Sequence, residues 1–222
     1  MSNDLFERQR QDFLWYCLFG ITKTDAENDK DKALDACIER AYRDLSRTIK
    51  YKFTISEIEK NKPGAKEFKT NCKDQFKGKA TRAIKDGVQN IGACFDCWHK
   101  SLCNVIISKA KESKCIKDDE SFTYGQAQKW VNMTLKYMLI MGLWEEINDA
   151  INALHVPIDR YILIMLGYGE KYEGKAWSQI DAKDYKEIQK GIRQIITDSK
   201  YQSPIEWEFE AWIAQAKKEN NK

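Results

Sequence analysis

A well-marked helix start, followed by a long apolar periodicity, constrains the fold of this chain more than any other feature. Thr123 and Gln126 have the spacing of a capping box, in which each side chain accepts a hydrogen bond from the backbone N–H of the other residue. Apolar residues then recur at three- and four-residue steps as far as Met141, and Gly142 is a typical helix terminator. The pattern predicts an amphipathic α helix over residues 123–141.

Similar signals recur along all 222 residues. Three prolines, and glycines that mostly separate the periodic segments, argue against a β fold with many turns. The sequence therefore predicts an all-α protein, a single multi-helix globular domain of about eight or nine helices without a substantial sheet. A turn at 61–64 and a polar loop at 113–121 are the candidate sites of a subdivision. The expected helices cover residues 4–20, 24–49, 65–89, 91–110, 123–141 and 144–154, a helix with Pro157 in its first turn, a helix capped by Ser178 or Asp181 that ends near 197, and a last helix from Ser203.

The first two expected helices have defined faces and starts. Thr24 and Glu27 have the spacing of another capping box, which predicts the start of the second helix. In the first helix, apolar residues are expected to pack inward. They are Phe6, Phe13, Leu14, Cys17 and Leu18.

No apolar run approaches the roughly 20 residues that a membrane-spanning helix needs. The first residues also lack the basic-then-apolar order of a signal peptide. We therefore expect a soluble, cytoplasmic protein with no membrane partner.

Basic residues are concentrated in one part of the chain. Residues 47–116 carry 16 basic and 7 acidic side chains, although the formal charge of the whole chain is only +3. A local excess of this kind attracts anionic partners such as nucleic acid, and it is also found on lysine-rich solvated helices. In the first interpretation, the helix at 65–89 binds DNA or RNA without sequence specificity. Its candidate contacts are Lys66, Lys69, Lys73, Lys77 and Arg82.

The seven cysteines are expected to be reduced in a protein without a secretion signal. Cys94, Cys97 and Cys103, with His99 among them, have the one spacing that resembles a metal site. On a continuous helix, however, Cys103 points away from Cys94. The spacing therefore favours free buried cysteines over a zinc or iron–sulfur site. No cofactor is predicted.

The common enzyme motifs are missing from this sequence. It contains no GxSxG, GxxxxGK[ST], HExxH or GxGxxG pattern. The two histidines are His99 and His155, and a lone histidine is more often a structural group than a catalyst. Asp159 remains the acid with the most informative context. It follows Val156-Pro157-Ile158 and is expected in the first turn of a helix, where the helix dipole stabilises a carboxylate.

The segment VPIDRYIL at 156–163 resembles a motif of the helix–hairpin–helix DNA glycosylases, in which the aspartate of a similar run is the catalytic acid. In that family a glycine-containing hairpin and a lysine nucleophile come before it, and YGQAQK at 124–129 occupies the comparable place. The resemblance implies a base-excision glycosylase/lyase acting on a modified or damaged DNA base. A lysine amine would attack the sugar as the base leaves, and an aspartate would stabilise the cationic sugar.

The resemblance also assigns roles to individual residues. Lys129 and Asp159 would be catalytic and would line one concave, partly aromatic pocket, with His155 at its rim and with Trp130 and Asn132 as further lining candidates. The hairpin, with Gly125 and Gln126, would grip the DNA backbone. In the alternative interpretation, Asp159 is a helix-start residue, Lys129 is a solvated lysine, and the chain is a non-enzymatic helical module that binds nucleic acid or another protein. The sequence does not define the oligomeric state.

Overall fold

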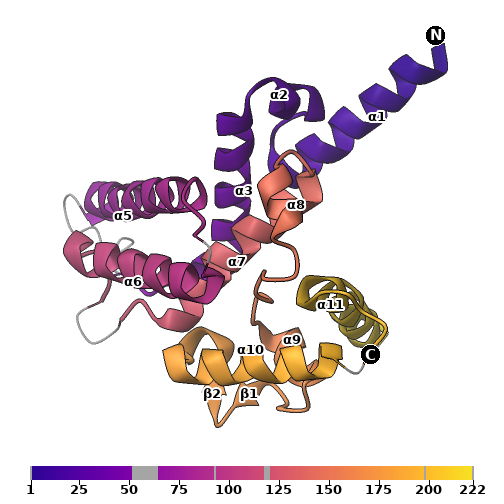
Figure 1. Cartoon of the computed structure of the whole chain (residues 1–222). Helices are drawn as coiled ribbons and strands as arrows, with labels where there is room; N and C mark the ends of the chain where they lie inside the picture. The colour runs from indigo at the N-terminus through magenta and orange to yellow at the C-terminus, as the bar shows by residue number, and fades with distance from the viewer. Residues whose placement is uncertain (1, 52–64, 93, 118–120, 198, 222) are drawn as a thin grey trace.

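Helix α7 (Tyr124–Met141) lies at the centre of the molecule, with the other helices arranged around it (Figure 1). The computed structural model describes residues 2–51, 65–92, 94–117, 121–197 and 199–221; the side chains of residues 2, 3, 65–69 and 72 lie outside this description. The described part contains ten α helices, two short 3₁₀ helices and one two-stranded hairpin, which confirms the all-α prediction. The remaining elements are α1 (Ser2–Phe19), α2 (Lys23–Asn28), α3 (Lys30–Leu45), η1 (Ser46–Thr48), α5 (Ala65–Val88), α6 (Phe95–Ser113), α8 (Glu145–Asp149), α9 (Arg160–Met165), β1 (Lys171–Tyr172), β2 (Lys175–Ala176), η2 (Trp177–Gln179), α10 (Ala182–Thr197) and α11 (Pro204–Asn220).

The capping box that the sequence predicts for α7 is present. The Thr123 hydroxyl accepts from the Gln126 N–H at 3.1 Å, and the Gln126 side chain accepts from the Thr123 N–H at 2.9 Å. Gly142 ends the helix in the left-handed conformation at φ 67°. Because α3 and α6 pack along α7, most of its residues are buried, and its apolar side chains form the middle of the core.

The second expected helix divides into α2 and α3, and the predicted cap at Thr24 is wrong. The Thr22 side chain caps α2, and the Asp29 side chain caps α3. Thr24 instead donates its backbone N–H and its hydroxyl to the Asp12 carboxylate of α1, at 2.9 and 3.0 Å. The Thr24 side chain, which the local pattern assigns to a helix cap, therefore takes part in a tertiary contact instead.

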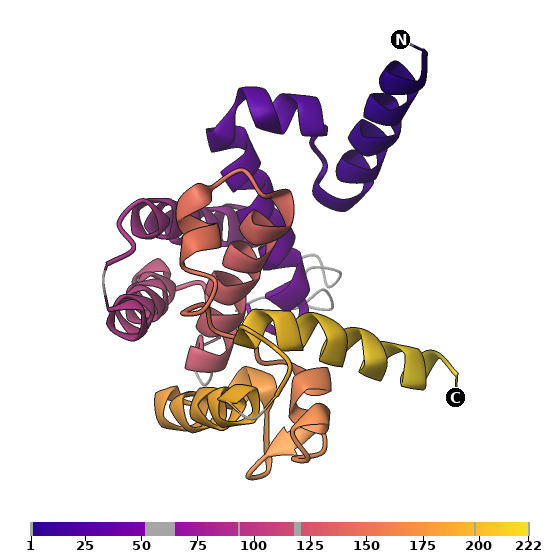
Figure 2. The same cartoon turned by 45° about the vertical axis from the view of Figure 1, so that its right-hand side comes forward.

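The expected inward face of α1 is also wrong, because α1 projects away from the other helices in both views (Figures 1 and 2). Phe6 and Phe13 are 62% and 68% exposed, and Leu14 and Leu18 are exposed as well. Only the end of α1 joins the core, where Phe19 is buried. An apolar helix face is buried only where another element lies opposite it, and the contacts of α1 with α2 and α3 leave these apolar residues uncovered.

The chain between α7 and α9 is less helical than its periodicity predicts. The expected helix at 144–154 is reduced to the short α8, and Pro157 lies before α9 instead of in its first turn. Asp159 is the N-cap of α9. Side chains of the flanking helices hold the backbone before it, since Gln128 of α7 donates to the Ile158 carbonyl at 3.0 Å and Gln189 of α10 donates to the Val156 carbonyl at 2.7 Å.

The last two helices begin close to their predicted starts. Of the two candidate caps for α10, Asp181 is the one used, because its carboxylate accepts the N–H groups of Lys183 and Asp184, both at 2.9 Å. Ser203 caps α11, and Pro204 occupies its first turn. In Figure 2, α11 extends outward to the C-terminus, and its inner part packs on α9.

Helices α5 and α6 form a pair that packs against α3 and α7 (Figure 1). One buried apolar cluster contains residues of α3, α5, α6, α7 and α10. Of the two candidate boundaries, 61–64 lies outside the described residues, and the second follows α6, where Ile116 forms a single antiparallel bridge with Tyr51. None of the helices in the described ranges is long and apolar enough to cross a membrane.

Candidate functional site

One face of α7 lines a pocket of about 950 Å³ that also borders α3, η1, the start of α9, η2 and α11. The α7 residues on this face recur at three- and four-residue steps, as one side of a helix requires. They are Lys129, Met133, Lys136, Tyr137 and Ile140. Segments that are far apart in the sequence therefore line a single pocket, and α7 forms one wall of it.

The pocket has an excess of positive charge. Six cationic side chains line it, and they are Arg40, Arg43, Arg47, Lys129, Lys136 and Arg160. Three acidic side chains also line it, and they are Asp44, Asp159 and Glu208. Arg47 is exposed, and it has no ion-pair partner among the described residues. Among the described residues, Arg43 pairs with Glu39, whose Oε1 lies 3.7 Å from Arg43 Nε. These two arginines can therefore bind an incoming anion without breaking a short ion pair.

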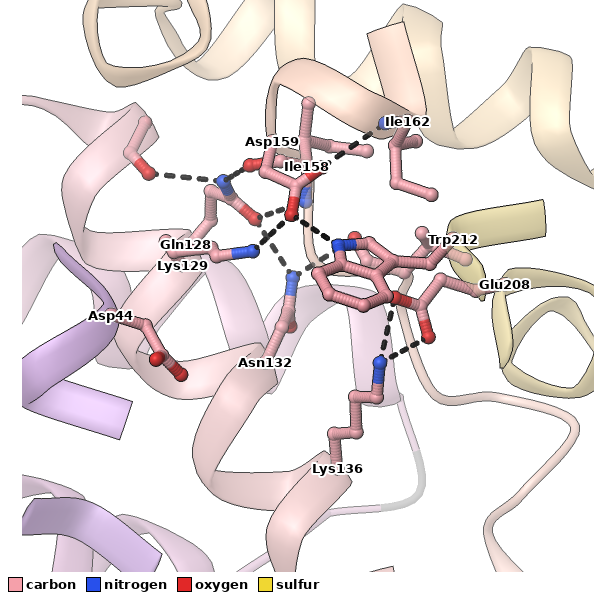
Figure 3. A network of polar contacts seen from close by, with 12 residues as sticks. Asp44, Gln128, Lys129, Asn132, Lys136, Ile158, Asp159, Ile162, Glu208 and Trp212 are labelled. Atoms are coloured by element: carbon pink, nitrogen blue, oxygen red, sulfur yellow. Dashed lines mark hydrogen bonds and ion pairs between the residues drawn. The ribbon is translucent and has the colours of Figure 1, made fainter. Parts of the chain in front are cut away.

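Lys129 and Asp159 form an ion pair in this pocket (Figure 3). Lys129 Nζ donates to Asp159 Oδ2 at 2.8 Å, and the two side chains are 7% and 18% exposed. The other carboxylate oxygen, Oδ1, accepts the Ile162 N–H at 3.0 Å, as an N-cap does. The indole of Trp212 also donates to Oδ2, at 3.1 Å. Asp159 therefore starts α9 and anchors two residues of the pocket.

The charge state of Asp159 follows from these contacts. Burial raises the pKa of its carboxyl, but the positive charge of Lys129 and the hydrogen bonds from Lys129, Ile162 and Trp212 outweigh burial and leave the pKa below its ordinary value. Asp159 is consequently a carboxylate at neutral pH, and Lys129 is its ammonium partner.

A second ion pair lies further along the same wall. Lys136 Nζ contacts both carboxylate oxygens of Glu208, at 2.6 and 2.7 Å, and it lies 4.8 Å from the centre of the Phe209 ring. Glu208 is almost completely buried, and burial raises the pKa of its carboxyl, although the Lys136 charge opposes the rise. This pair fixes α11 against α7, as Figure 3 shows.

Aromatic side chains complete the pocket. Its aromatic lining residues are Tyr137, Tyr161, Trp177, Phe209 and Trp212. The Trp177 ring lies 5.9 Å from Lys129 Nζ, and the Tyr161 and Trp212 rings are 5.3 Å apart. Trp212 is 37% exposed, so part of its ring is open to solvent. The hollow thus combines cations with flat apolar rings.

The three other residues that the resemblance assigns to the pocket lie elsewhere, which corrects that expectation. Trp130 is fully buried, and its indole donates to the Ile38 carbonyl at 3.1 Å. Asn132 is also fully buried, and it donates to the Tyr185 hydroxyl at 2.8 Å. His155 points into the same interior cluster. Each of these polar groups is already bonded within the protein, so none of them is free to line a cleft.

That interior cluster contains both histidines of the chain. His155 Nδ1 lies 2.8 Å from the Tyr185 hydroxyl, and its Nε2 lies 2.8 Å from Asp96 Oδ1. His99 Nε2 lies 2.9 Å from Asn132 Oδ1, and its ring stacks on Tyr185 at 5.3 Å. Burial lowers the pKa of His155 to about 4 and that of His99 well below its ordinary value. The two neutral histidines are therefore part of a structural network that joins α6, α7, α10 and the segment before α9.

Gly125 and Gln126, which the resemblance places against a DNA backbone, are buried in the protein. The Gly125 N–H donates to the Ile180 carbonyl at 3.0 Å, and the Gln126 amide donates to the Thr48 carbonyl at 2.7 Å. Their donors are therefore occupied by the protein, and the α7 start does not present them to a ligand.

Of the candidate basic residues of α5, the three whose side chains are described do not share one exposed surface. The side chains of Lys66 and Lys69 lie outside the described part of the chain. Lys73 and Lys77 lie 5.9 and 5.0 Å from the Tyr42 ring of α3, and Lys77 also pairs with Glu39. Arg82 is exposed and lines a smaller hollow, of about 540 Å³, between α5 and α6.

The cysteines are not all reduced, which corrects the expectation from the sequence. Cys94 and Cys97 form a disulfide at the start of α6. Cys103 is buried, with its sulfur 3.8 Å from the ring nitrogens of His99, while Cys17 and Cys37 are free thiols. Among the residues that the structure describes, no group of three or more His, Cys, Asp or Glu side chains could hold a metal ion.

The pocket also contains residues that the sequence pattern does not single out. Arg40 and Arg43 come from α3, Arg47 comes from η1 and Trp177 begins η2, and none of these segments has a ligand-binding motif. Only their position opposite α7 distinguishes them from other surface residues.

No family model, curated protein or solved structure matches this chain.

Proposed function

We propose that the α7 pocket binds one unit of a nucleic-acid strand. A base would stack on the exposed ring of Trp212, and a neighbouring phosphate would bind Arg43 and Arg47. The observation that supports this most is the presence of five aromatic and six cationic side chains around one hollow. Stacking on aromatic rings and phosphate neutralisation by arginine are the two interactions by which proteins bind single strands.

The charge of the pocket supports an anionic ligand in particular. The cationic lining residues outnumber the acidic ones six to three, and the two lysines are already neutralised by Asp159 and Glu208. Arg40 also pairs with Asp44, and Arg160 pairs with Glu170 and Glu219, so the attraction for an anion comes mainly from Arg43 and Arg47. Because phosphate binding releases counterions, the affinity should fall steeply as the salt concentration rises.

Fluorescence anisotropy with labelled single-stranded DNA and RNA oligonucleotides tests the proposal. Arg43→Glu combined with Arg47→Glu should weaken binding at low salt by at least about tenfold and should flatten its salt dependence. Trp212→Ala should weaken binding by roughly 5- to 160-fold, since one stacked base contributes about 1–3 kcal/mol. Trp212→Phe is the matched control, because it keeps an aromatic ring and should retain most of the affinity.

Helix α5 provides the comparison that can contradict this assignment. Lys79→Glu combined with Arg82→Glu reverses the same amount of charge on exposed residues outside the pocket. If that variant loses as much affinity as the arginine variant of the pocket, the basic helix carries the binding and the pocket proposal is wrong. Absence of binding at low salt would also overturn it.

Base excision is a second candidate function, and one observation favours it. Lys129 and Asp159, the nucleophile and acid implied by the resemblance, are 2.8 Å apart and line the same pocket as the proposed base-binding ring. In this ion pair Lys129 is protonated, so it must lose a proton before it can attack a sugar carbon. An incoming sugar would have to replace Asp159 as the neighbour of the amine.

Two variants test excision separately from binding. Asp159→Asn should abolish release of a modified base without weakening binding of the oligonucleotide, because asparagine can still cap α9 and Lys129 loses its neutralising partner. Lys129→Gln should remove any adduct that borohydride traps on a damaged oligonucleotide. If no modified base is released by the unaltered protein, or if Asp159→Asn releases it normally, excision is excluded and strand binding stands alone.

A further inference from the structure

The start of α6 presents two cysteines side by side at the surface. Cys94 is the N-cap of α6 and Cys97 lies in its first turn; both are exposed, and together they form a disulfide. Their Cα atoms are 5.4 Å apart, a usual separation for a disulfide. The helix start itself brings the two residues together, because the side chain of an N-cap residue lies over the N–H of the residue three positions later.

The segment between and around the cysteines is firmly held. Phe95 is buried against the His155 ring, with the ring centres 5.0 Å apart, and the Trp98 indole donates to the Gly87 carbonyl at 2.9 Å. Asp96 is bonded to His155 at 2.8 Å and to Arg193 at 3.0 Å. The backbone that carries the two sulfurs is thus anchored by contacts that do not involve the sulfurs.

A structural role explains this disulfide poorly. The stabilisation that a disulfide gives by restricting the unfolded chain increases with the length of the loop it closes, and this loop contains only two residues between the cysteines. The anchoring contacts on either side already fix the same turn of helix. A disulfide that is exposed and closes so short a loop is suited to reversible reduction and oxidation.

Local charge favours a thiolate at Cys94. Its sulfur accepts the Cys97 N–H at 3.4 Å, at the helix end where the dipole is positive. The one acid between the cysteines, Asp96, is partly neutralised: the hydrogen bonds from Arg193 and His155 lower its pKa to about 2. Burial, in contrast, raises the pKa of the Cys37 and Cys103 thiols, which makes these poor nucleophiles.

We propose that Cys94 and Cys97 are a redox-active pair that undergoes thiol–disulfide exchange with a disulfide substrate. In the reduced protein, the Cys94 thiolate attacks one sulfur of the substrate, the substrate S–S bond breaks, and one substrate thiolate leaves. The Cys97 thiolate then attacks the Cys94 sulfur, the Cys94–Cys97 bond forms, and the second substrate thiolate leaves. Two protein thiols are oxidised and one substrate disulfide is reduced. This proposal is independent of strand binding at the α7 pocket.

The first experiment measures the redox equilibrium of the full chain, with Cys17→Ser to remove the exposed thiol of α1. The protein is equilibrated with mixtures of reduced and oxidised glutathione, free thiols are alkylated, and peptides are analysed by mass. The pair should convert reversibly between two thiols and a disulfide, while the far-ultraviolet circular dichroism spectrum stays unchanged. A pair that remains oxidised in all mixtures, or that unfolds the protein when reduced, would show a structural disulfide and overturn the proposal.

The second experiment identifies the attacking sulfur. In Cys97→Ser, the mixed disulfide between Cys94 and one glutathione should accumulate, because the resolving thiol is missing. At neutral pH, this mixed disulfide should form at Cys94 at least about ten times faster than a mixed disulfide forms at Cys17, measured in a variant that retains Cys17. Cys17 is exposed but does not lie at a helix N-terminus. Equal rates at the two cysteines would contradict the proposal.

Two parallel assays show whether the substrate disulfide belongs to a small molecule or to a protein. One measures reduction of glutathione disulfide, and the other measures reduction of the insulin disulfides with dithiothreitol as the final reductant. Turnover of one substrate assigns the pair to small or to protein disulfides, and Cys94→Ser should abolish it. No turnover of either substrate by the reduced protein would overturn the proposal.

Discussion

Both histidines of the chain lie in the buried cluster of α6, α7 and α10, where they serve as hydrogen-bonding groups. His99 is inaccessible to solvent and His155 is 6% exposed. They connect Asp96 at the start of α6 to Tyr185 of α10 and Asn132 of α7. In the sequence each histidine looks isolated, and the fold brings their rings to 4.7 Å from one another. Both are neutral at physiological pH, since burial lowers their pKa values.

This cluster should make the folded state sensitive to mild acid. The pKa of His155 is about 4 in the folded protein and near its ordinary value of 6.5 in the unfolded chain. Between these values the unfolded chain binds more protons than the folded one, so stability is complete above about pH 6.5 and falls as the pH decreases toward 4. The loss from His155 should reach about 3 kcal/mol at most.

Urea unfolding between pH 7 and 4.5 measures this effect. The free energy of unfolding of the unaltered protein should decrease steadily over that range. In His155→Gln, which keeps a donor for Asp96 but does not titrate, the decrease should be smaller. A free energy that is constant between pH 7 and 5 would contradict the assignment of neutral buried histidines.

At the scale of elements, α7 depends on a close approach at its first turn. A Cβ on Gly125 would lie 2.2 Å from the Trp177 carbonyl oxygen and 3.1 Å from the Ser178 carbonyl carbon. The Gly125 N–H also bonds the Ile180 carbonyl. Glycine at this position therefore lets η2 lie directly on α7, and η2 carries Trp177 of the candidate pocket.

Gly125→Ala should consequently destabilise the protein by about 1–3 kcal/mol, because the contact is with backbone that cannot move without shifting η2. Gly191→Ala on α10 is the matched control: a Cβ there meets nothing within 4 Å, so the substitution should stabilise by about 0.5–1 kcal/mol. Thermal unfolding of the two variants provides the comparison. An unchanged melting temperature for Gly125→Ala would show that the close approach is not required.

At the scale of the whole molecule, the candidate pocket exists because α3, α9, η2 and α11 converge on one face of α7. Figure 3 shows Lys129 and Lys136 of α7 meeting acids from the α9 cap and from α11. The same arrangement leaves the apolar face of α1 uncovered, so that Phe6 and Phe13 remain exposed. Burial of an amphipathic face is thus decided by which element lies opposite it.

The sequence by itself determined the all-α class and some of the helix ends. The Thr123–Gln126 box, the Gly142 terminator and the Ser203 cap depend on residues within a few positions of each other, so their chemistry is complete in the local sequence. It also indicated Lys129 and Asp159 as residues that would share a pocket, although their roles stay predictions. Only the tertiary structure decided that Thr24 bonds Asp12 instead of capping a helix, that α1 is exposed, and that His155 and Asn132 lie in the interior. These outcomes depend on contacts between residues 12 to more than 50 positions apart, and a local pattern contains no information on which distant group will satisfy a polar side chain or cover an apolar one.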